Sequence, residues 1–385
     1  MERALSKPDL KELVQQTRAY LCIDCSKCTA SCPLGRVGTV YSPRSFVQHL
    51  LIEDEAPSPE IFWRCLTCGL CHERCPSDVD FPGFVRELRC EAIKQGLKPH
   101  TTHSGAIHEI MRIIANPTVK PKRTSWLPDR IQILTEADQA EDIYFVGCAP
   151  YFETIFEDFH LSLLETHIAA LELLRSCGLN PCVLADERCC GHDALWSGDL
   201  ELFKRLANLN VEAFRRAGVK RIFVTCPECY HTLAKEYPKY VDDFQFEIIH
   251  TVKYLAENLE TQATRTDGVT VTYLDSCRMG RFAHLYDEPR KLLADLVDVR
   301  LVEMEMNREN APCCGSNLWI NCDSISKRLQ VACLEEVART GASVLICPCD
   351  KCRIHLTCAQ LDNGDLKLKI KTENILSFLH RRGVS

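Results

Sequence analysis

The stretch that decides the organisation of the chain is CIDCSKCTASCP at residues 22–33, which returns as CLTCGLCHERCP at residues 65–76. Each copy spaces four cysteines as C-x2-C-x2-C-x3-C and follows the last with a proline. Three thiolates at this spacing come from one tight loop and can hold three irons of a four-iron–four-sulfur cubane. Zinc also binds C-x2-C pairs, but two complete copies with the trailing proline favour iron and sulfur.

The fourth cysteine of each copy is expected to cross over. In two-cluster ferredoxins the cysteine before the proline ligates the partner cluster. We therefore assign one cubane to Cys22, Cys25, Cys28 and Cys75, and the other to Cys65, Cys68, Cys71 and Cys32. Such a pair conducts electrons, so the rest of the chain must hold what ends or branches that path.

The cysteine content helps to identify the cellular compartment of the protein. The chain has 25 cysteines in 385 residues, which suits either a disulfide-rich secreted protein or a metalloprotein in a reducing compartment. Residues 1–21 are charged and amphipathic and lack the apolar core of a signal peptide. No stretch approaches the length of a membrane span, and a net charge of -7 argues against nucleic acid. We therefore expect a soluble, cytoplasmic metalloprotein with no direct membrane span.

The pattern along the chain predicts an α+β protein. Helices are expected at 9–20, 43–53, 82–95 and 104–115, before a proline-rich and basic stretch. Short apolar runs then alternate with helical stretches at 154–176, 199–217 and 323–339, which indicates mainly parallel sheets. The expected strands are 142–147, 182–185, 221–225, 246–250, 269–275, 299–304 and 343–347. We divide the chain into a helical module (1–115), a linker (116–140) and two α/β domains (141–262 and 263–385).

The two α/β domains are internal repeats. GCAPYF (147–152) corresponds to SCRMGR (276–281), RCCGHDALW (188–196) to PCCGSNLW (312–319), and TCPECYHTL (225–233) to PCDKCRIHL (348–356). Each repeat offers five cysteines: Cys148, Cys189, Cys190, Cys226 and Cys229 in the first, and Cys277, Cys313, Cys314, Cys349 and Cys352 in the second. Gly191 and Gly315 would let the backbone turn sharply against a cofactor. Redox disulfides or buried reduced thiols are the alternative, but the matched order of both sets favours a metal cofactor.

These motifs resemble a known family. LCIDCSKCTASCPLGR and IFWRCLTCGLCHERCPSDVDF look like the small, C-type iron–sulfur subunit of heterodisulfide reductase, and the paired CCG repeats look like its catalytic, B-type subunit. One chain carrying both resembles the fused D-type subunit. The resemblance implies two noncubane four-iron–four-sulfur clusters, each held by five cysteines of one repeat. It also implies that the clusters face each other across a pocket, and that a flavin-containing A-type subunit and further redox subunits are partners.

The resemblance implies a catalytic subunit that passes electrons from the flavin subunit through two cubanes to the noncubane pair, which reduces a disulfide. Three alternative functions remain open. The first is a pure electron-transfer subunit, as in a bifurcating aromatic-acyl-CoA reductase complex, and the second is a glycolate or lactate oxidase subunit. The third is a structural or regulatory zinc protein. His192 is a candidate proton or hydrogen-bond donor to a cluster, and Arg281 could orient an anionic substrate. Cys347 competes with Cys349 as a ligand. The other cysteines are expected in packing roles: Cys90, Cys177, Cys182, Cys322, Cys333 and Cys358.

Overall fold

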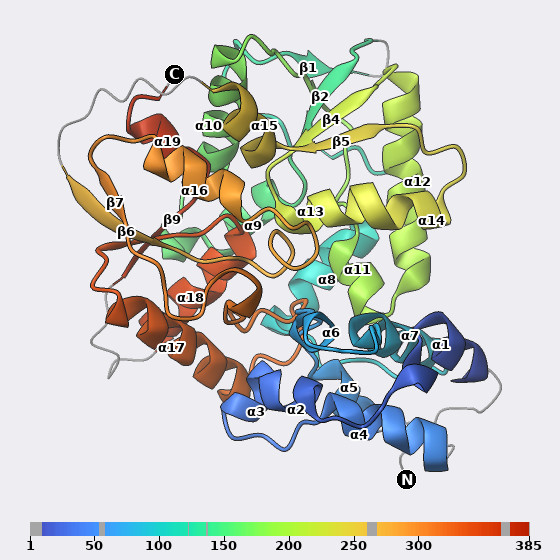
Figure 1. Cartoon of the computed structure of the whole chain (residues 1–385). Coiled ribbons are helices and arrows are strands. Elements are labelled where there is room, and N and C mark those ends of the chain that lie inside the picture. Colours follow the sequence, from blue (N-terminus) through green and yellow to red (C-terminus); the bar gives the residue numbers. More distant parts are fainter. Residues whose placement is uncertain are drawn as a thin grey trace.

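The structure, a computed structural model, describes residues 10–53, 58–121, 123–135, 138–259, 268–362 and 370–384. It has the expected α+β architecture, with an N-terminal helical module followed by two α/β repeats. Figure 1 shows most helices of the module gathered at one end of the molecule, below the two sheets. Within the described residues, no helix has the length and apolar character needed to cross a membrane.

The N-terminal module is a set of short helices between its cysteine loops. Helix α7 begins after Asp80, whose carboxylate accepts the Gly83 N–H at 3.0 Å, and Pro82 occupies its first turn. The expected helix at 82–95 is therefore found, one residue earlier. The helices are α1 (Leu10–Gln16), α2 (Lys27–Ser31), α3 (Pro33–Arg36), α4 (Pro43–Gln48), α5 (Pro59–Trp63), α6 (Leu70–Glu73), α7 (Phe81–Lys94) and α8 (Ala106–Ile114).

The first repeat has a parallel sheet in the order β2-β4-β5, with β3 beside β2 through a bridge between Ile143 and Cys182. Its strands are β2 (Asp142–Phe145), β3 (Val183–Leu184), β4 (Arg221–Val224) and β5 (Glu247–His250). A further strand, β1 (Ile133–Leu134), pairs with β3 and buries Leu134. The segment expected as a linker, 116–140, thus contributes a strand to the first repeat.

The helices of the first repeat differ from expectation in one place. The predicted helix 154–176 is two helices, because His160 and Ser162 adopt left-handed backbone angles (φ 50° and 48°) between them. The predicted helix 199–217 is α12, which Asp199 caps. The helices are α9 (Ala149–Ile155), α10 (Leu163–Ser176), α11 (His192–Ser197), α12 (Leu200–Arg216), α13 (Pro227–His231), α14 (Tyr237–Tyr240) and α15 (Thr251–Asn258).

The second repeat has a parallel sheet in the order β7-β6-β8-β9. Strands β7, β6, β8 and β9 correspond in position to β3, β2, β4 and β5 of the first repeat. The two repeats that the cysteine motifs indicate therefore share one sheet topology. The strands are β6 (Val269–Tyr273), β7 (Val299–Leu301), β8 (Val344–Ile346) and the unexpected β9 (Lys371–Glu373); the helices are α16 (Asp287–Ala294), α17 (Ser324–Arg339), α18 (Asp350–Asp362) and α19 (Ile375–Arg381).

The two repeats share a hydrophobic core between their sheets. Tyr144 and Phe223 of the first sheet belong to the same buried cluster as Tyr273 and Ile346 of the second. Helices α10 and α15 of the first repeat pack against α19 and α16 of the second (Figure 1). Because the strands within each sheet are parallel, the cysteine loops that follow β2, β4, β6 and β8 lie at the carboxyl ends of the sheets, where sites collect in such folds.

Candidate functional site: four cysteine clusters

The cysteines of the N-terminal module line two neighbouring cavities. Cys22, Cys25 and Cys28 line one together with Cys75, while Cys32 lines the other with Cys65 and Cys68. Cys71 borders both cavities. The fourth cysteine of each motif therefore lies with the first three of the other motif, as the crossed assignment requires. Backbone N–H groups of Thr67 and Val79 point at the sulfurs of Cys65 and Cys75, at 3.3 and 3.4 Å, which suits sulfurs that carry negative charge.

All five cysteines of the first repeat meet in one place, which we call the first CCG site. Side-chain hydrogen bonds connect Cys148 to Cys189, Cys189 to Cys190, and Cys226 to Cys229. The sulfurs of Cys190 and Cys229 are 3.4 Å apart. A cluster of thiols from three separate loops, most of them buried, is the donor set that an iron–sulfur cluster requires.

The five cysteines of the second repeat form an equivalent group, the second CCG site. Side-chain hydrogen bonds connect Cys277 to Cys313, Cys313 to Cys314, and Cys349 to Cys352. The sulfurs of Cys314 and Cys352 are 3.0 Å apart. Cys347 also contacts Cys352 and is fully buried, so both Cys347 and Cys349 remain within reach of the site.

Gly191 and Gly315 occupy equivalent positions and share the same left-handed backbone angle, φ 79°. Glycine adopts this angle at no cost, whereas other residues do not. A Cβ atom would lie 2.9 Å from Cδ2 of Phe203 at Gly191, and 3.1 Å from Cβ of Leu329 at Gly315. Both glycines therefore bring the CCG loops close against the following long helix, α12 or α17; their contact with a cofactor stays a prediction.

The N-terminal module touches the second CCG site directly. Cys68, from the second ferredoxin motif, hydrogen-bonds to Cys313, and this contact lowers the pKa of the Cys68 thiol to about 6. Arg281 donates to the Cys68 carbonyl at 2.7 Å and to the carbonyls of Ala311 and Glu309 at 3.0 and 3.2 Å. Arg281 is 7% exposed. These contacts make Arg281 a bridge between the two modules; the suggested contact with a substrate anion stays a prediction.

Arg278 reinforces the same junction. It donates to the Thr67 hydroxyl at 3.0 Å, and its guanidinium lies 4.2 Å from the Trp196 ring centre and 4.1 Å from that of Phe282. Trp196 belongs to the first repeat, so Arg278 joins all three parts of the molecule. In the repeat alignment Arg278 and Arg281 correspond to Ala149 and Phe152, so only the second repeat has this pair of basic side chains.

A buried charge cluster separates the two CCG sites. Lys351 of the second repeat forms ion pairs with Asp193 and, at 2.6 Å, with Glu228 of the first repeat. Glu228 and Lys351 are equivalent residues of the two C-x2-C motifs. Burial opposes the charge of Lys351, but the two carboxylates outweigh it and raise its pKa, while burial raises the pKa of Glu228 to about 7. Buried ion pairs therefore connect the C-x2-C motif of the second site with the first repeat.

His192 belongs to this cluster. Its Nδ1 lies 3.1 Å from the Thr232 hydroxyl and its Nε2 lies 3.5 Å from Oε1 of Glu228. The side chain is 2% exposed, and burial, helped by Arg278, holds its pKa well below the ordinary value. His192 is thus a neutral, enclosed imidazole beside the first CCG site, and its role as a donor stays a prediction.

Several residues that support the first CCG loops escaped the sequence analysis. Glu187 accepts the N–H groups of Val146 and Gly147 at 3.2 and 2.7 Å and pairs with buried Arg123 at 3.0 Å. Asn210 donates to the Cys189 carbonyl at 3.2 Å, and Tyr237 donates to that of Cys190 at 3.1 Å. Arg123 lies in the expected linker. One indication of a role for Glu187 was visible in the sequence, because this residue directly precedes the RCCG motif.

The comparisons with known proteins agree with this division. Residues 18–79 match a four-iron–four-sulfur dicluster domain, and residues 143–234 and 271–357 each match the cysteine-rich domain CCG. The D-type subunit of the dihydromethanophenazine:CoB–CoM heterodisulfide reductase of Methanosarcina barkeri is 25% identical over 82% of this chain and 76% of its own length. The expected order of a ferredoxin-like module and two CCG domains is thereby confirmed.

Two further proteins are similar to this chain. The B-type subunit of the CoM/CoB fumarate reductase of Methanothermobacter marburgensis is 26% identical over 93% of this chain and 71% of its own length. A crystal structure of a hypothetical protein from Helicobacter pylori covers 97% of this chain and 71% of its own, with a TM-score of 0.54 and 10% identity. At that identity the likeness concerns the fold alone.

Proposed function

Because this chain is a CCG-domain iron–sulfur oxidoreductase subunit, we propose that it delivers electrons from its ferredoxin module to the second CCG site and there reduces a disulfide. The module would hold two cubane clusters on its eight motif cysteines, and each CCG site a noncubane cluster on its five. Bound there, such clusters would supply storage and transfer of single electrons. Cleaving one disulfide to two thiols takes two electrons and two protons.

The observation that carries the proposal is the contact between Cys68 and Cys313, whose loops Arg281 joins by donating to the Cys68 and Ala311 carbonyls. It joins the ligand set of the module to that of the second CCG site through a single side-chain contact. Arg278 and Arg281 hold this contact from both sides, because they bind Thr67 and the Cys68 carbonyl. A rigid, buried junction of this kind keeps two redox centres at a fixed separation.

Electrons would enter at the far end of the module. Cys25 is exposed, and beside it Tyr20 and Ile23 are 51% and 66% exposed. An exposed ligand rimmed by apolar side chains is suited to docking a partner protein. We propose that the partner is a flavin-containing subunit of the heterodisulfide reductase A type within a larger complex, as the resemblance implies.

The test is a single turnover with protein loaded with iron and sulfide under anaerobic conditions. The protein is reduced with dithionite, freed of excess reductant, and mixed with bis(2-hydroxyethyl) disulfide. We expect the iron–sulfur absorbance to return as two thiols are released for each disulfide consumed. Reoxidation with no thiol released would overturn the proposal.

The buried charge cluster favours a second candidate, an electron relay without a substrate of its own. Glu228 and Lys351, one from the C-x2-C motif of each CCG site, form an ion pair at 2.6 Å, which would oppose a disulfide gripped between the two motifs. A relay would leave the disulfide intact in the single turnover, and the reduced protein would be reoxidised only by an oxidised partner protein. The same experiment therefore separates the two candidates.

A further inference from the structure

Two buried arginines lie where the ferredoxin module meets the second CCG site. Arg278 directly follows Cys277 in the loop after β6, and Arg281 comes three residues later. They are only 3% and 7% exposed. Among the residues that the structure describes, neither guanidinium forms an ion pair with a carboxylate. Burying an unpaired charge is very costly, so two such cations indicate that negative charge of another kind lies beside them.

Each arginine also has an N–H group that no protein atom accepts. Arg278 donates to Thr67 and Arg281 to three carbonyls, but Nη1 of Arg278 and Nη2 of Arg281 are buried without a hydrogen-bond partner. The rings of Trp196 and Phe282 stabilise the Arg278 cation, although they carry no net charge. Because buried donors are almost always satisfied in native proteins, the two groups indicate an acceptor that binds there.

The neighbours of the arginines are cysteines of two assigned ligand sets. Burial opposes the charge of Arg281, but Cys68, Cys277 and Cys313 outweigh burial and raise its pKa. The pKa of the Cys277 thiol is lowered, first by its hydrogen bond with Cys313 and then, against burial, by Arg278 and Arg281. Iron–sulfur clusters on thiolates have electron-rich sulfurs that accept hydrogen bonds. The two arginines therefore fit clusters held by these cysteines.

The first CCG site has a different electrostatic environment. At the two equivalent positions the first repeat has Ala149 and Phe152. The buried cations near its cysteines each lie beside a carboxylate: Lys351 beside Asp193 and Glu228, Arg123 beside Glu187, and Arg188 beside Asp186. The group around Lys351 borders both CCG sites and so does not distinguish them. The second site therefore has more positive charge around it than the first.

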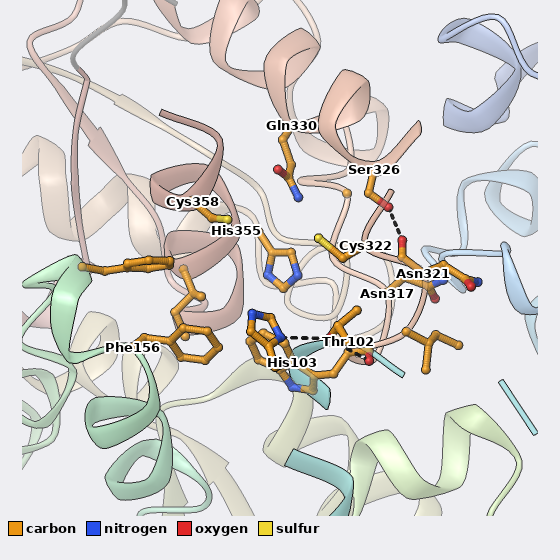
Figure 2. A pocket seen from close by; sticks show the side chains of 15 residues that line it. Thr102, His103, Phe156, Asn317, Asn321, Cys322, Ser326, Gln330, His355 and Cys358 are labelled. Atoms are coloured by element: carbon orange, nitrogen blue, oxygen red, sulfur yellow. Dashed lines mark hydrogen bonds between the residues drawn. The ribbon is translucent and has the colours of Figure 1, made fainter. Parts of the chain in front are cut away.

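A small pocket beside the second CCG site does not offset this charge. Gly315 of the CCG loop is part of its lining, and Figure 2 shows the Gln330 amide and the His355 ring directed into it. None of the described lining residues is Asp, Glu, Lys or Arg. Burial lowers the pKa of His355, which keeps the ring neutral. This side of the loop therefore provides no carboxylate to balance the two arginines.

We propose that Arg278 and Arg281 raise the reduction potential at the second CCG site above that at the first, and so favour reduction at the second site. This proposal rests on the part of the proposed function that gives each CCG site a cluster, and it holds whatever the electrons finally reduce. Each step adds one electron from an external donor and breaks no bond. A nearby cation stabilises the added negative charge, so Arg278 and Arg281 are positioning residues for charge.

The expected size of the effect follows from Coulomb's law. At the effective dielectric of a protein, a unit charge within about 10 Å changes an equilibrium constant by about tenfold. A tenfold change in the equilibrium constant for one-electron reduction is about 59 mV. An exposed charge has a much smaller effect because water and salt screen it.

The test is a potentiometric titration of iron-loaded protein with dithionite and redox mediators, followed by electron paramagnetic resonance under anaerobic conditions. The signal of each CCG site is assigned by its loss when Cys313 and Cys314, or Cys189 and Cys190, are replaced by alanine. We expect the second site to have the higher midpoint potential, by at least about 59 mV. Equal potentials, or the reverse order, would overturn the proposal without need of any arginine variant.

Substitution of Arg278 tests the cause. Arg278→Met should lower the midpoint potential of the second site by about 59 mV, a tenfold loss, and leave that of the first site unchanged. Arg278→Lys keeps the charge and should restore most of the potential. Arg300→Met removes an exposed arginine from β7 of the same repeat and is the matched control, which should leave both potentials unchanged. An unchanged second-site potential in Arg278→Met, or an equal fall in Arg278→Lys, would overturn the charge effect.

The titration contains no disulfide, so its outcome is independent of thiol release in the single turnover. Thiol release together with equal midpoint potentials would overturn this proposal and leave the proposed function intact. The expected order of potentials without thiol release would support this proposal and overturn disulfide reduction. Iron-loaded protein without a signal from either CCG site would overturn both.

Discussion

The two repeats have the same strand order and the same order of five cysteines, yet their surroundings differ. The second CCG site touches the ferredoxin module through Cys68 and adjoins the pocket that contains His355. The first shares the ion pairs of Glu228 and Asp193 with Lys351 of the second, and Cys148 and Cys189 line the pocket beside it together with aliphatic and aromatic side chains of α8 and α9. Duplication thus preserved the order of the five cysteines, while substitutions around them gave the two sites different neighbours.

Removing one pair of adjacent cysteines at a time tests whether the two sites differ in function. Cys313→Ala with Cys314→Ala, and Cys189→Ala with Cys190→Ala, should each remove about 4 of about 16 irons. We expect only the second-site variant to stop reoxidation of the ferredoxin module by a disulfide, because the second site is the one that contacts Cys68. Stopped-flow absorbance after dithionite reduction measures the rate. Equal loss in both variants would mean that the two sites act as one unit.

The charge cluster between the repeats should be the most sensitive structural feature. Lys351→Met leaves two buried carboxylates without a countercharge, and we expect it to destabilise the fold by about 3–5 kcal/mol. Thermal unfolding monitored by circular dichroism checks this. Lys220→Met, which breaks an exposed pair with Glu141, is the control and should cost less than about 1 kcal/mol. Adding Glu228→Gln to Lys351→Met should recover part of the loss; no recovery would argue against a charge effect.

Substitution of Arg281 should distinguish a structural role of this side chain from a role in substrate binding. Arg281→Lys keeps the charge but loses the fork that reaches three carbonyls, so we expect about 2–3 kcal/mol less stability. Hydrogen exchange should rise in residues 65–71 while KM for the disulfide stays unchanged. Phe152→Leu, at the equivalent position of the first repeat, should leave exchange in that segment unaltered. A raised KM with normal exchange would instead support the substrate contact expected from the sequence.

The repeats should also differ in their response to acid. Burial lowers the pKa of His167, in the first repeat, to about 3. Because this folded pKa lies below the ordinary value of about 6.5, the unfolded chain binds a proton first as pH falls, and stability is lost between about pH 6.5 and 3. At pH 5 the cost is about 2 kcal/mol. His167→Gln should flatten the dependence of the melting temperature between pH 7.5 and 5; an unchanged slope would contradict the assignment.

Much of the scaffold could be predicted because its signals are local. The spacing of cysteines indicated which cysteines lie together, and α12 and α17 were found from their amphipathic pattern; an aspartate caps each of these helices. Strands β1 and β9 were missed, although β3 and β7 are equally short and were found, because β1 lies in the stretch expected as a linker and β9 has the polar sequence KTE; both are held by pairing with a neighbour. The break between α9 and α10 was missed because it depends on left-handed backbone angles, which the spacing of apolar residues does not predict.

The candidate site was harder to predict, since its decisive contacts join distant segments. Nothing in the sequence places Cys68 beside Cys313, or Arg123 beside Glu187, because these pairs depend on how the modules dock. One feature was visible beforehand: the repeat alignment sets Glu228 and Lys351, which carry opposite charges, at equivalent positions, and the structure pairs them. The pocket beside His355 required the structure, since its lining comes from several separate segments.

The pairing of Glu228 with Lys351 also has a consequence for how this duplication can assemble. If the first repeat associated with a second copy of itself in the same geometry, two buried glutamates would face each other; two copies of the second repeat would bring two lysines together. Either arrangement would bury like charges, which is strongly unfavourable. The ion pair therefore selects one partner for each half, and it fixes the tandem as an asymmetric pair that neither half can replace by pairing with itself.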